Sequence, residues 1–220
     1  MRRFNPISPG LLAGRLTELF LQRQTDIAHA GQPHPLRVAL DAPGWVDLEP
    51  LITGVAERLA VRGHPVATVR GVDFYRDASL RFEYGKTDVE SFYTGWLDTA
   101  ALQREVLKPL GAGGTGSYLP ALRDPVSNRS ARTPPVPLAA EAIVLVRGEL
   151  LLDTGLAFDI VVHFSVSRQA LRRLAPAEEA WALPAFDRYE IDVDPAGQAD
   201  VVLRYDDPSH PALFARPREE

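Results

Sequence analysis

The segment from residue 37 to residue 60 constrains the fold of this chain more than any other stretch. Val38 to Leu40 is a short apolar run that predicts a buried strand, and a sharp turn follows at Asp41, Ala42, Pro43 and Gly44. Apolar side chains then recur at helical spacing, at Leu48, Leu51, Ile52, Val55 and Leu59. A strand, a tight turn and an amphipathic helix are the layout of a phosphate-binding loop, whose backbone N–H groups cradle phosphates.

The residues that carry the chemistry of such a loop are missing from this turn. The pattern G-x-x-x-x-G-K-[ST] supplies a Lys for the phosphates and a Ser or Thr for Mg²⁺. Here one glycine is followed by Trp45, Val46, Asp47 and Leu48. Asp47 is well placed to cap the helix, but its charge would repel a phosphate. We therefore interpret residues 41–47 as the remnant of a phosphate loop.

Composition narrows the class of protein. A length of 220 residues suits one α/β domain, and a net charge of -5 gives no sign of a nucleic-acid surface. The absence of cysteine excludes disulfides, thiolate metal sites and a Cys nucleophile. The first residues carry neither a signal-peptide pattern nor a long apolar run, so we expect a cytoplasmic protein without a membrane segment. The rarity of lysine, found only at Lys86 and Lys108, hints at a bacterial coding bias.

Short strands alternate with helices along the rest of the chain. Strands are predicted at 65–69, 142–148 and 159–166, with a last strand at 200–205, and helices at 8–30, 98–110 and 167–174. This order predicts an α/β fold in three layers, with a mostly parallel five-stranded sheet and helices on both faces. Residues 1–35 are expected to be a helix and linker packed on a domain of residues 36–214, and 215–220 a disordered tail.

Two further segments need an interpretation. GAGGTG, at 111–116, follows a helix and precedes a stretch rich in Pro, Ser and Arg, whereas a phosphate loop joins a strand to a helix. We interpret it as a flexible connector. Residues 71–99 are polar and aromatic without clear periodicity. Loops of that kind, at the carboxyl ends of parallel strands, are where ligands bind in open α/β sheets.

The order and spacing of several strings resemble the uridine kinase family of P-loop phosphotransferases, especially its divergent bacterial branch. The resemblance runs from about Leu36 to Leu213 and rests on RVALD, VDFYR, DVESFYTGWLDTAALQREVLKPLG, IVLVRGELLL and ADVVLRYDDP. It implies a P-loop kinase fold and the transfer of a phosphoryl group from ATP, with Mg²⁺, to a nucleoside or another small alcohol.

Against that family, three catalytic elements are altered. The phosphate-loop Lys and Ser/Thr have no counterpart, the general-base Asp falls at Val72, and the Walker B acid falls at Arg147. A shift of one residue would restore Asp73 as a base. Arg147 would either supply positive charge to a phosphate or, the interpretation we prefer, form an ion pair with Asp41 or Asp47. ATP and Mg²⁺ are therefore expected only if the phosphate site has been rebuilt, and no other metal site is predicted.

The resemblance also implies an acceptor side and a lid. The acceptor-pocket residues would be Asp88, Tyr93, Arg123, Asp124, Asn128 and Arg129. The lid arginines would be Arg168, Arg172 and Arg173, and the loop beside the adenine would contain Asp207 and Pro208. Each has an ordinary alternative as a loop polar group, a core aromatic or part of a solvated basic helix face. His163 lies in an apolar strand and is interpreted as a core residue, not a ligand.

Three hypotheses follow. The first is a kinase-like protein that has lost phosphotransfer and binds a nucleoside, a nucleotide or another protein. The second is an active phosphotransferase with a rebuilt site, using Arg147 or the lid arginines for charge and Asp73 as base. The third is a structural partner, such as one half of a homodimer, with the helix at 8–30 as its interface.

Overall fold

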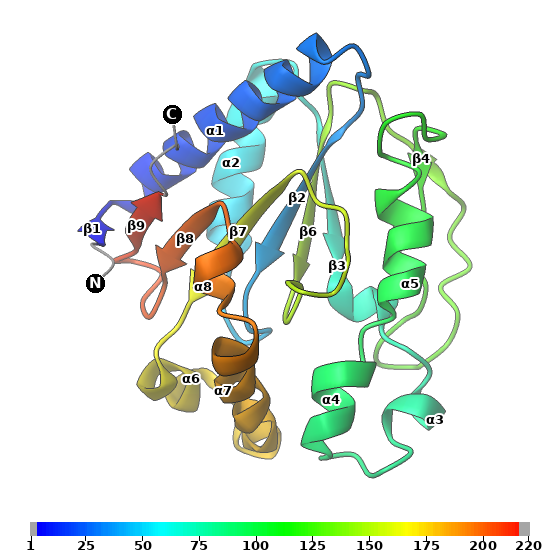
Figure 1. Cartoon of the computed structure of the whole chain (residues 1–220), viewed down its shortest axis with the longest axis vertical. Helices are drawn as coiled ribbons and strands as arrows, with labels where there is room; N and C mark the ends of the chain where they lie inside the picture. The colour runs from blue at the N-terminus through cyan, green and yellow to red at the C-terminus, as the bar shows by residue number, and fades with distance from the viewer. Residues whose placement is uncertain (1–3, 216–220) are drawn as a thin grey trace.

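A seven-stranded sheet forms the centre of the computed structural model, which describes residues 4–215 (Figure 1). The strands lie in the order β1-β9-β8-β7-β2-β6-β3. Five of them, from β8 to β3 in that order, are parallel, and β9 and β1 are added antiparallel at one edge. Their bounds are β1 Asn5–Pro6, β2 Leu36–Asp41, β3 Val66–Arg70, β6 Ile143–Gly148, β7 Ile160–Ser165, β8 Val201–Arg204 and β9 Ala212–Ala215.

The prediction of a mostly parallel α/β sheet is confirmed, but the strand count of five was too low. The five predicted strands are the five parallel ones, whereas the segment at 200–205 is not the last strand, because β9 follows it. β1, at the edge, has only two residues, too few for a period-2 pattern, and the four-residue β9 pairs between β1 and β8. Of the predicted tail at 215–220, Ala215 is the last residue of β9 and the rest lies outside the described residues.

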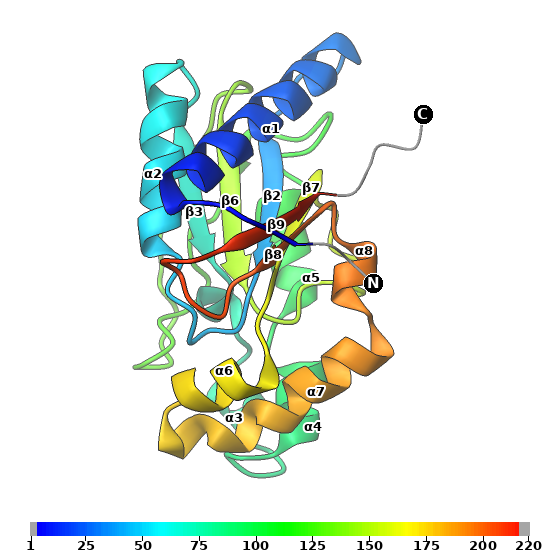
Figure 2. The same ribbon diagram turned by 90° about the vertical axis from the view of Figure 1, so that its left-hand side faces the viewer.

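Helices α1 (Pro9–His29) and α2 (Glu49–Val61) cover one face of the sheet, as Figure 2 shows. The side chain of Ser8 accepts the Leu11 N–H and caps α1, and Pro9 occupies the first turn, where its missing N–H costs nothing. The two helices and this face share one core, which includes Leu12, Leu16, Phe20, Leu51, Val55, Val38 and Leu145. None of the helices in residues 4–215 is long and apolar enough to cross a membrane.

The opposite face is covered by α5 (Thr99–Leu102), which continues as a π-helical turn, Gln103–Leu107, and by α8 (Pro195–Gln198). The glycine-rich connector at 111–116 lies by the amino ends of the strands, because Gly111 packs against Arg37 at the start of β2. A Cβ on Gly111 would lie 2.7 Å from Arg37 Nη1. The connector leads into a small ribbon of β4 (Ser117–Tyr118) and β5 (Val136–Pro137), so it is a turn after a helix and not a second phosphate loop.

Short helices gather beyond the carboxyl ends of the parallel strands (Figures 1 and 2). They are a 3₁₀ turn at Gly71–Phe74, α3 (Ala78–Arg81), α4 (Val89–Gly95), α6 (Arg168–Leu174), a 3₁₀ segment at Ala177–Ala182, and α7 (Leu183–Asp192). The segment at 71–99 therefore contains short helices where no periodicity was evident. Its aromatic side chains pack against α7 and the 3₁₀ segment in a separate core cluster.

Candidate functional site

The loop between β2 and α2 occupies the position of a phosphate loop, at the carboxyl edge of the sheet. Its Gly44 N–H donates to Glu149 Oε2 at 2.9 Å. The Tyr75 hydroxyl donates to the other oxygen of the same carboxylate, Oε1, at 2.5 Å. Desolvation by burial raises the pKa of Glu149, while the hydrogen bonds from Tyr75 and Gly44 oppose that shift. The Glu149 carboxylate therefore accepts a backbone N–H that a phosphate loop would donate to the phosphate of its ligand.

Arg147 is bound to the same loop from the other side. Its Nη2 donates to the carbonyl of Val46 at 2.8 Å and to that of Gly44 at 3.4 Å, and Nη1 lies 3.3 Å from Glu49 Oε1. The preferred ion pair with Asp41 or Asp47 is therefore wrong, because the carboxylate partner of Arg147 is Glu49. Asp47 instead accepts the Glu49 N–H at 3.0 Å. It lies one residue before the N-cap of α2, which is Leu48, so the prediction that Asp47 caps this helix is wrong.

Trp45, the residue after Gly44, turns away from the strands toward α7. Its ring lies 5.3 Å from that of Phe186, between centroids, and its Nε1 donates to Glu179. The side chain is half-buried. The loop is thereby attached to the segment that follows α6.

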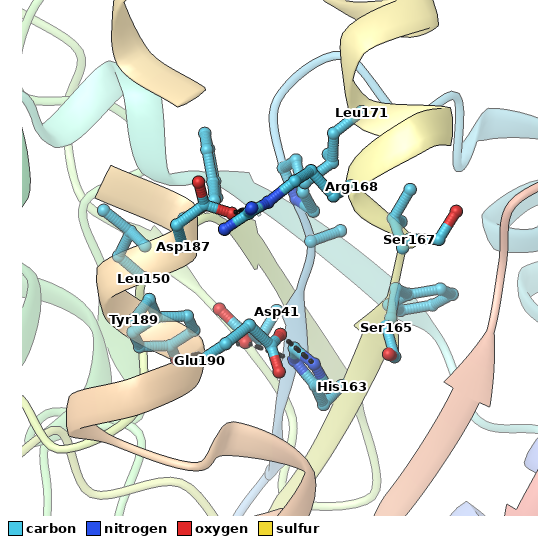
Figure 3. A pocket seen from close by; sticks show the side chains of 15 residues that line it. Asp41, Leu150, His163, Ser165, Ser167, Arg168, Leu171, Asp187, Tyr189 and Glu190 are labelled. Carbon is cyan, nitrogen blue, oxygen red and sulfur yellow. Dashed lines mark hydrogen bonds and ion pairs between the residues drawn. The ribbon is translucent and has the colours of Figure 1, made fainter. Parts of the chain in front are cut away.

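On the other side of β2, Asp41 and His163 are paired. They are register neighbours at the ends of β2 and β7, and Asp41 Oδ2 lies 2.7 Å from His163 Nδ1 (Figure 3). The Tyr189 hydroxyl donates to the same oxygen at 3.1 Å, and the Leu151 N–H donates to Oδ1 at 3.0 Å. The pair is buried, with 1% of Asp41 and 3% of His163 exposed.

The protonation of His163 follows from these neighbours. Desolvation by burial acts to lower its pKa, but the hydrogen bond to Asp41 and the charges of Asp41 and Glu190 raise the pKa to about 9. His163 Nε2 has no hydrogen-bond partner among the described residues and lies 3.7 Å from Glu190 Oε1. His163 is therefore an imidazolium at neutral pH. Burial, followed by the charge of Asp41, raises the pKa of the Tyr189 hydroxyl, so Tyr189 stays protonated.

A cavity of about 270 Å³ opens beside this pair, between the ends of β2 and β7 and helices α6 and α7 (Figure 3). His163 does lie in the core as interpreted, but it also lines this cavity, which the sequence did not indicate. Arg168, one of the predicted lid arginines, lines the cavity too and donates from Nε to Asp187 at 2.7 Å. Arg173 instead donates to the carbonyl of Asp206, and Arg172 is exposed.

Two further cavities lie on the β6 and β3 side of the loop. One, of about 210 Å³, is lined by Arg147, Glu149, Arg70 and Val72 among others. Val72 and Glu149 also line the second, of about 490 Å³, whose lining includes six aromatic side chains. Asp73, the candidate base, is held by Arg70, with Nε–Oδ2 at 2.8 Å and Nη2–Oδ1 at 2.5 Å, and lines neither cavity.

The loop residues assigned to an acceptor pocket bind their own loop or the start of α3. Asp124 accepts the Val126 and Ser127 N–H groups, and these hydrogen bonds, that of Ser127 first, lower its pKa. Arg123 forms an ion pair with Asp77 at 3.1 Å, Asn128 accepts the Ala78 N–H, and Arg129 is exposed.

Asp88, Tyr93 and the adenine-side loop lie elsewhere. Asp88 caps α4 through Ser91, whose hydroxyl and N–H lower the pKa of Asp88. Tyr93 stacks under the Arg188 guanidinium at 4.3 Å and lines a small cavity of about 50 Å³. Asp207 binds His210, its Nδ1 2.8 Å away, and neither Asp207 nor Pro208 lines one of the cavities described above.

Comparison with known proteins identifies the fold. No protein-family model and no curated protein matches the sequence. A structure described as a possible uridine kinase from Bacillus stearothermophilus aligns with a TM-score of 0.62 at 15% identity, over 82% of this chain and 97% of that one. A candidate fructose transport system kinase from Silicibacter sp. aligns with a TM-score of 0.56 at 18% identity, over 88% and 95%. The chain therefore has the P-loop kinase fold. This is the fold that the sequence resemblance implied.

Several residues of the site were not found from the sequence. Glu149 directly follows the Walker B-like strand, and a carboxylate at the end of a parallel strand was the available signal. His163 and Asp41 both stand at strand ends, but only the register of β2 against β7 makes them neighbours. Tyr75 lies in the aromatic segment 71–99 that was expected to bind a ligand, but its partner Glu149 was not predicted. Glu179 carried no signal, because its partner Trp45 lies in a distant segment.

Proposed function

We propose that this chain has kept the P-loop kinase fold, has lost phosphoryl transfer from ATP, and acts as a small-molecule-binding protein. The observation that carries the proposal is the 2.9 Å hydrogen bond from the Gly44 N–H to Glu149. In a phosphate loop, backbone N–H groups of this turn face phosphate oxygens. Here the oxygen comes from a side chain of the same protein, so an ATP phosphate would have to displace a carboxylate.

Charge around the loop supports the same conclusion. Asp47, Glu49 and Glu149 place three carboxylates on or beside the loop and the start of α2. Arg147 already uses its guanidinium on two loop carbonyls and Glu49. Two like charges at 4 Å repel by about 4 kcal/mol at an effective dielectric constant of 20. Phosphoryl transfer depends on cations around the phosphates, and this loop presents the opposite charge.

The rebuilt phosphotransferase is the second candidate, and the geometry gives it less support. Its base, Asp73, is bound in bidentate fashion by Arg70 and lines none of the cavities described above. Its cation, Arg147, would have to release the loop before it could reach a phosphate. We therefore favour the binding function, with the cavities at the carboxyl edge of the sheet as the place where a ligand enters.

The test is a calorimetric titration with ATP, with and without Mg²⁺, together with an assay of γ-phosphoryl transfer to nucleosides and sugars. We expect no binding tighter than about 1 mM, the equivalent of about 4 kcal/mol, and no transfer above background. Mg²⁺-dependent ATP binding that is lost in Arg147→Met would overturn the proposal and establish a rebuilt phosphate site. Arg104→Met is the matched control, because it also replaces an arginine by methionine but removes only an exposed ion pair with the neighbouring Glu105.

A further inference from the structure

The largest of the cavities described above is lined by six aromatic rings. Its volume is about 490 Å³, and Gly44 and Val72 stand where it meets the loop. The rings come from five separate segments: the loop after β2, the turn before α3, the C-cap of α3, α4 with its C-cap, and the 3₁₀ segment at Ala177–Ala182. They are Trp45, Tyr75, Phe82, Phe92, Trp96 and Trp181. We call this space the aromatic cavity.

Trp96 is the centre of this ring cluster. Its centroid lies 5.7 Å from Tyr75, 5.6 Å from Phe82, 5.1 Å from Phe92 and 5.6 Å from Trp181. Three of these four pairs are edge-to-face, an arrangement in which the electron-rich face of one ring meets the electropositive edge of another. Rings fixed in this way by one another form a rigid wall that needs no ligand to hold its shape.

The cluster already stabilises one buried cation of the protein. The Arg81 guanidinium carbon lies 4.7 Å from the Phe82 ring centroid, 5.0 Å from that of Trp96 and 5.6 Å from that of Tyr75. Arg81 is 7% exposed, and its Nε donates to the carbonyl of Arg76. Within residues 4–215 the structure gives it no ion pair with a carboxylate. Ring faces therefore take the place of a counter-ion here.

Charged groups on the wall favour a positive ligand. Two carboxylates, of Glu149 and Glu179, line the aromatic cavity, against one ammonium group, of Lys86. The two carboxylates are fixed on the wall by hydrogen bonds, from Tyr75 and Gly44 to Glu149 and from Trp45 to Glu179. Lys86 is exposed and can turn its ammonium group into the solvent.

We infer that the aromatic cavity binds a small organic cation whose positive charge sits on an alkylated nitrogen. This inference rests on the proposed binding function and names the class of its ligand. A quaternary ammonium group has no N–H to donate and is weakly hydrated, so faces of Trp, Tyr and Phe attract it where hydrogen-bonding sites would not. The two carboxylates add long-range attraction without having to touch the charge.

Tryptophan fluorescence gives a direct measurement, because all three tryptophans of the chain line this cavity. The full-length protein is titrated with choline and, in parallel, with 3,3-dimethyl-1-butanol, in which a carbon replaces the charged nitrogen at the same shape. Calorimetry repeats both titrations. We expect a saturable fluorescence change with choline, at a Kd of about 1 mM or below, and binding of the neutral alcohol weaker by about tenfold or more.

Two variants place the binding in the cavity. Glu179→Gln removes one wall carboxylate and Trp181→Leu removes one ring, and each should weaken choline binding by about threefold to thirtyfold. Glu178→Gln is the matched control, because the adjacent carboxylate is exposed and does not line the cavity; its Kd should equal that of the unmodified protein. Circular dichroism and the unfolding midpoint show whether each variant is folded.

The outcomes separate this inference from the proposed function. Equal binding of choline and its neutral isostere, or binding unaffected by Glu179→Gln and Trp181→Leu, would overturn the cation inference. Saturable binding of uridine by a protein that does not bind choline would also overturn the cation inference, but it would be consistent with the proposed binding function. Binding of Mg²⁺-ATP, measured in the separate titration, would instead overturn the proposed function.

Discussion

The charged Asp41–His163 pair predicts a specific dependence of stability on pH. The pKa of His163 is about 9 in the folded chain, against 6.5 for an unperturbed histidine. Because the folded-state pKa is raised, the stabilisation is fully present below pH 6.5 and is lost as the pH rises through about 9. The shift of about 2.5 units corresponds to about 3 kcal/mol at 1.36 kcal/mol per unit.

The perturbation is His163→Gln, which keeps a polar group beside Asp41 but cannot titrate. Urea unfolding of both proteins is measured between pH 6 and pH 9.5. The groups that face His163 are Asp41 from β2 and Tyr189 and Glu190 from α7. Unfolded tyrosines ionise near pH 10, so the upper limit keeps Tyr189 out of the measurement. Over this range the unmodified protein should lose about 3 kcal/mol more unfolding free energy than the variant.

Equal pH dependence of the two proteins would refute the reasoning, because His163 would then be neutral in the folded state. A second readout needs no variant. The Cε1 proton of His163, followed by NMR in the unmodified protein, should titrate with a midpoint near 9. A midpoint below 7 would show that burial, and not Asp41, decides the charge of the imidazole.

Two further predictions concern ion pairs that hold the loops to the sheet. Arg37 and Asp159 form a nearly buried bidentate pair, with Nη2–Oδ1 at 2.7 Å and Nε–Oδ2 at 2.9 Å. Asp159→Asn should therefore lower the free energy of unfolding by about 3 kcal/mol. A loss below about 1 kcal/mol would contradict this prediction. Arg147→Met should lower the free energy of unfolding by about 1 to 2 kcal/mol, because the Val46 and Gly44 carbonyls lose their donor. Arg168→Met, which removes an exposed ion pair with Asp187, should lower it by less than about 1 kcal/mol. Equal losses in the two variants would be inconsistent with a loop-binding role for Arg147.

Much of the fold could be predicted because its signals are local. The central strand, the turn at Pro43 and Gly44, and the apolar face of α2 lie within one stretch of sequence, and each pattern has the period of its element. Ser8 before Pro9 marks the start of α1 for the same reason. The antiparallel strands β1 and β9 could not be predicted, since their pairing with one another joins segments at opposite ends of the described chain.

The site was harder to predict because its partners are far apart in sequence. Asp41 and His163 are separated by 122 positions, and Trp45 and Glu179 by 134. The alternation of side chains along a strand would have excluded the Arg147–Asp41 pair. Leu40 packs toward α1 and α2, so Asp41 points to the opposite face. Val146 packs on that opposite face, so Arg147 points toward α2 and meets Glu49. The loop residues at 123–129 were assigned by resemblance; Asp124 binds N–H groups of its own loop, and Arg123 and Asn128 bind the start of α3.

The attachment of Trp45 to the segment after α6 has a consequence for the timing of ligand exchange. One wall of the aromatic cavity includes side chains from residues 75–96 and the other includes the 3₁₀ segment at Ala177–Ala182. Trp45 contacts the second wall through Glu179, and its ring also packs on Phe186 of α7. Trp181 also meets Phe92 and Trp96 across the gap, with centroids 5.6 Å apart in both pairs. To part the walls, the chain must break these ring contacts and the indole hydrogen bond together. For a ligand that leaves by parting these walls, the residence time would be set by contacts the protein makes with itself, and loosening Trp45 would hasten its release.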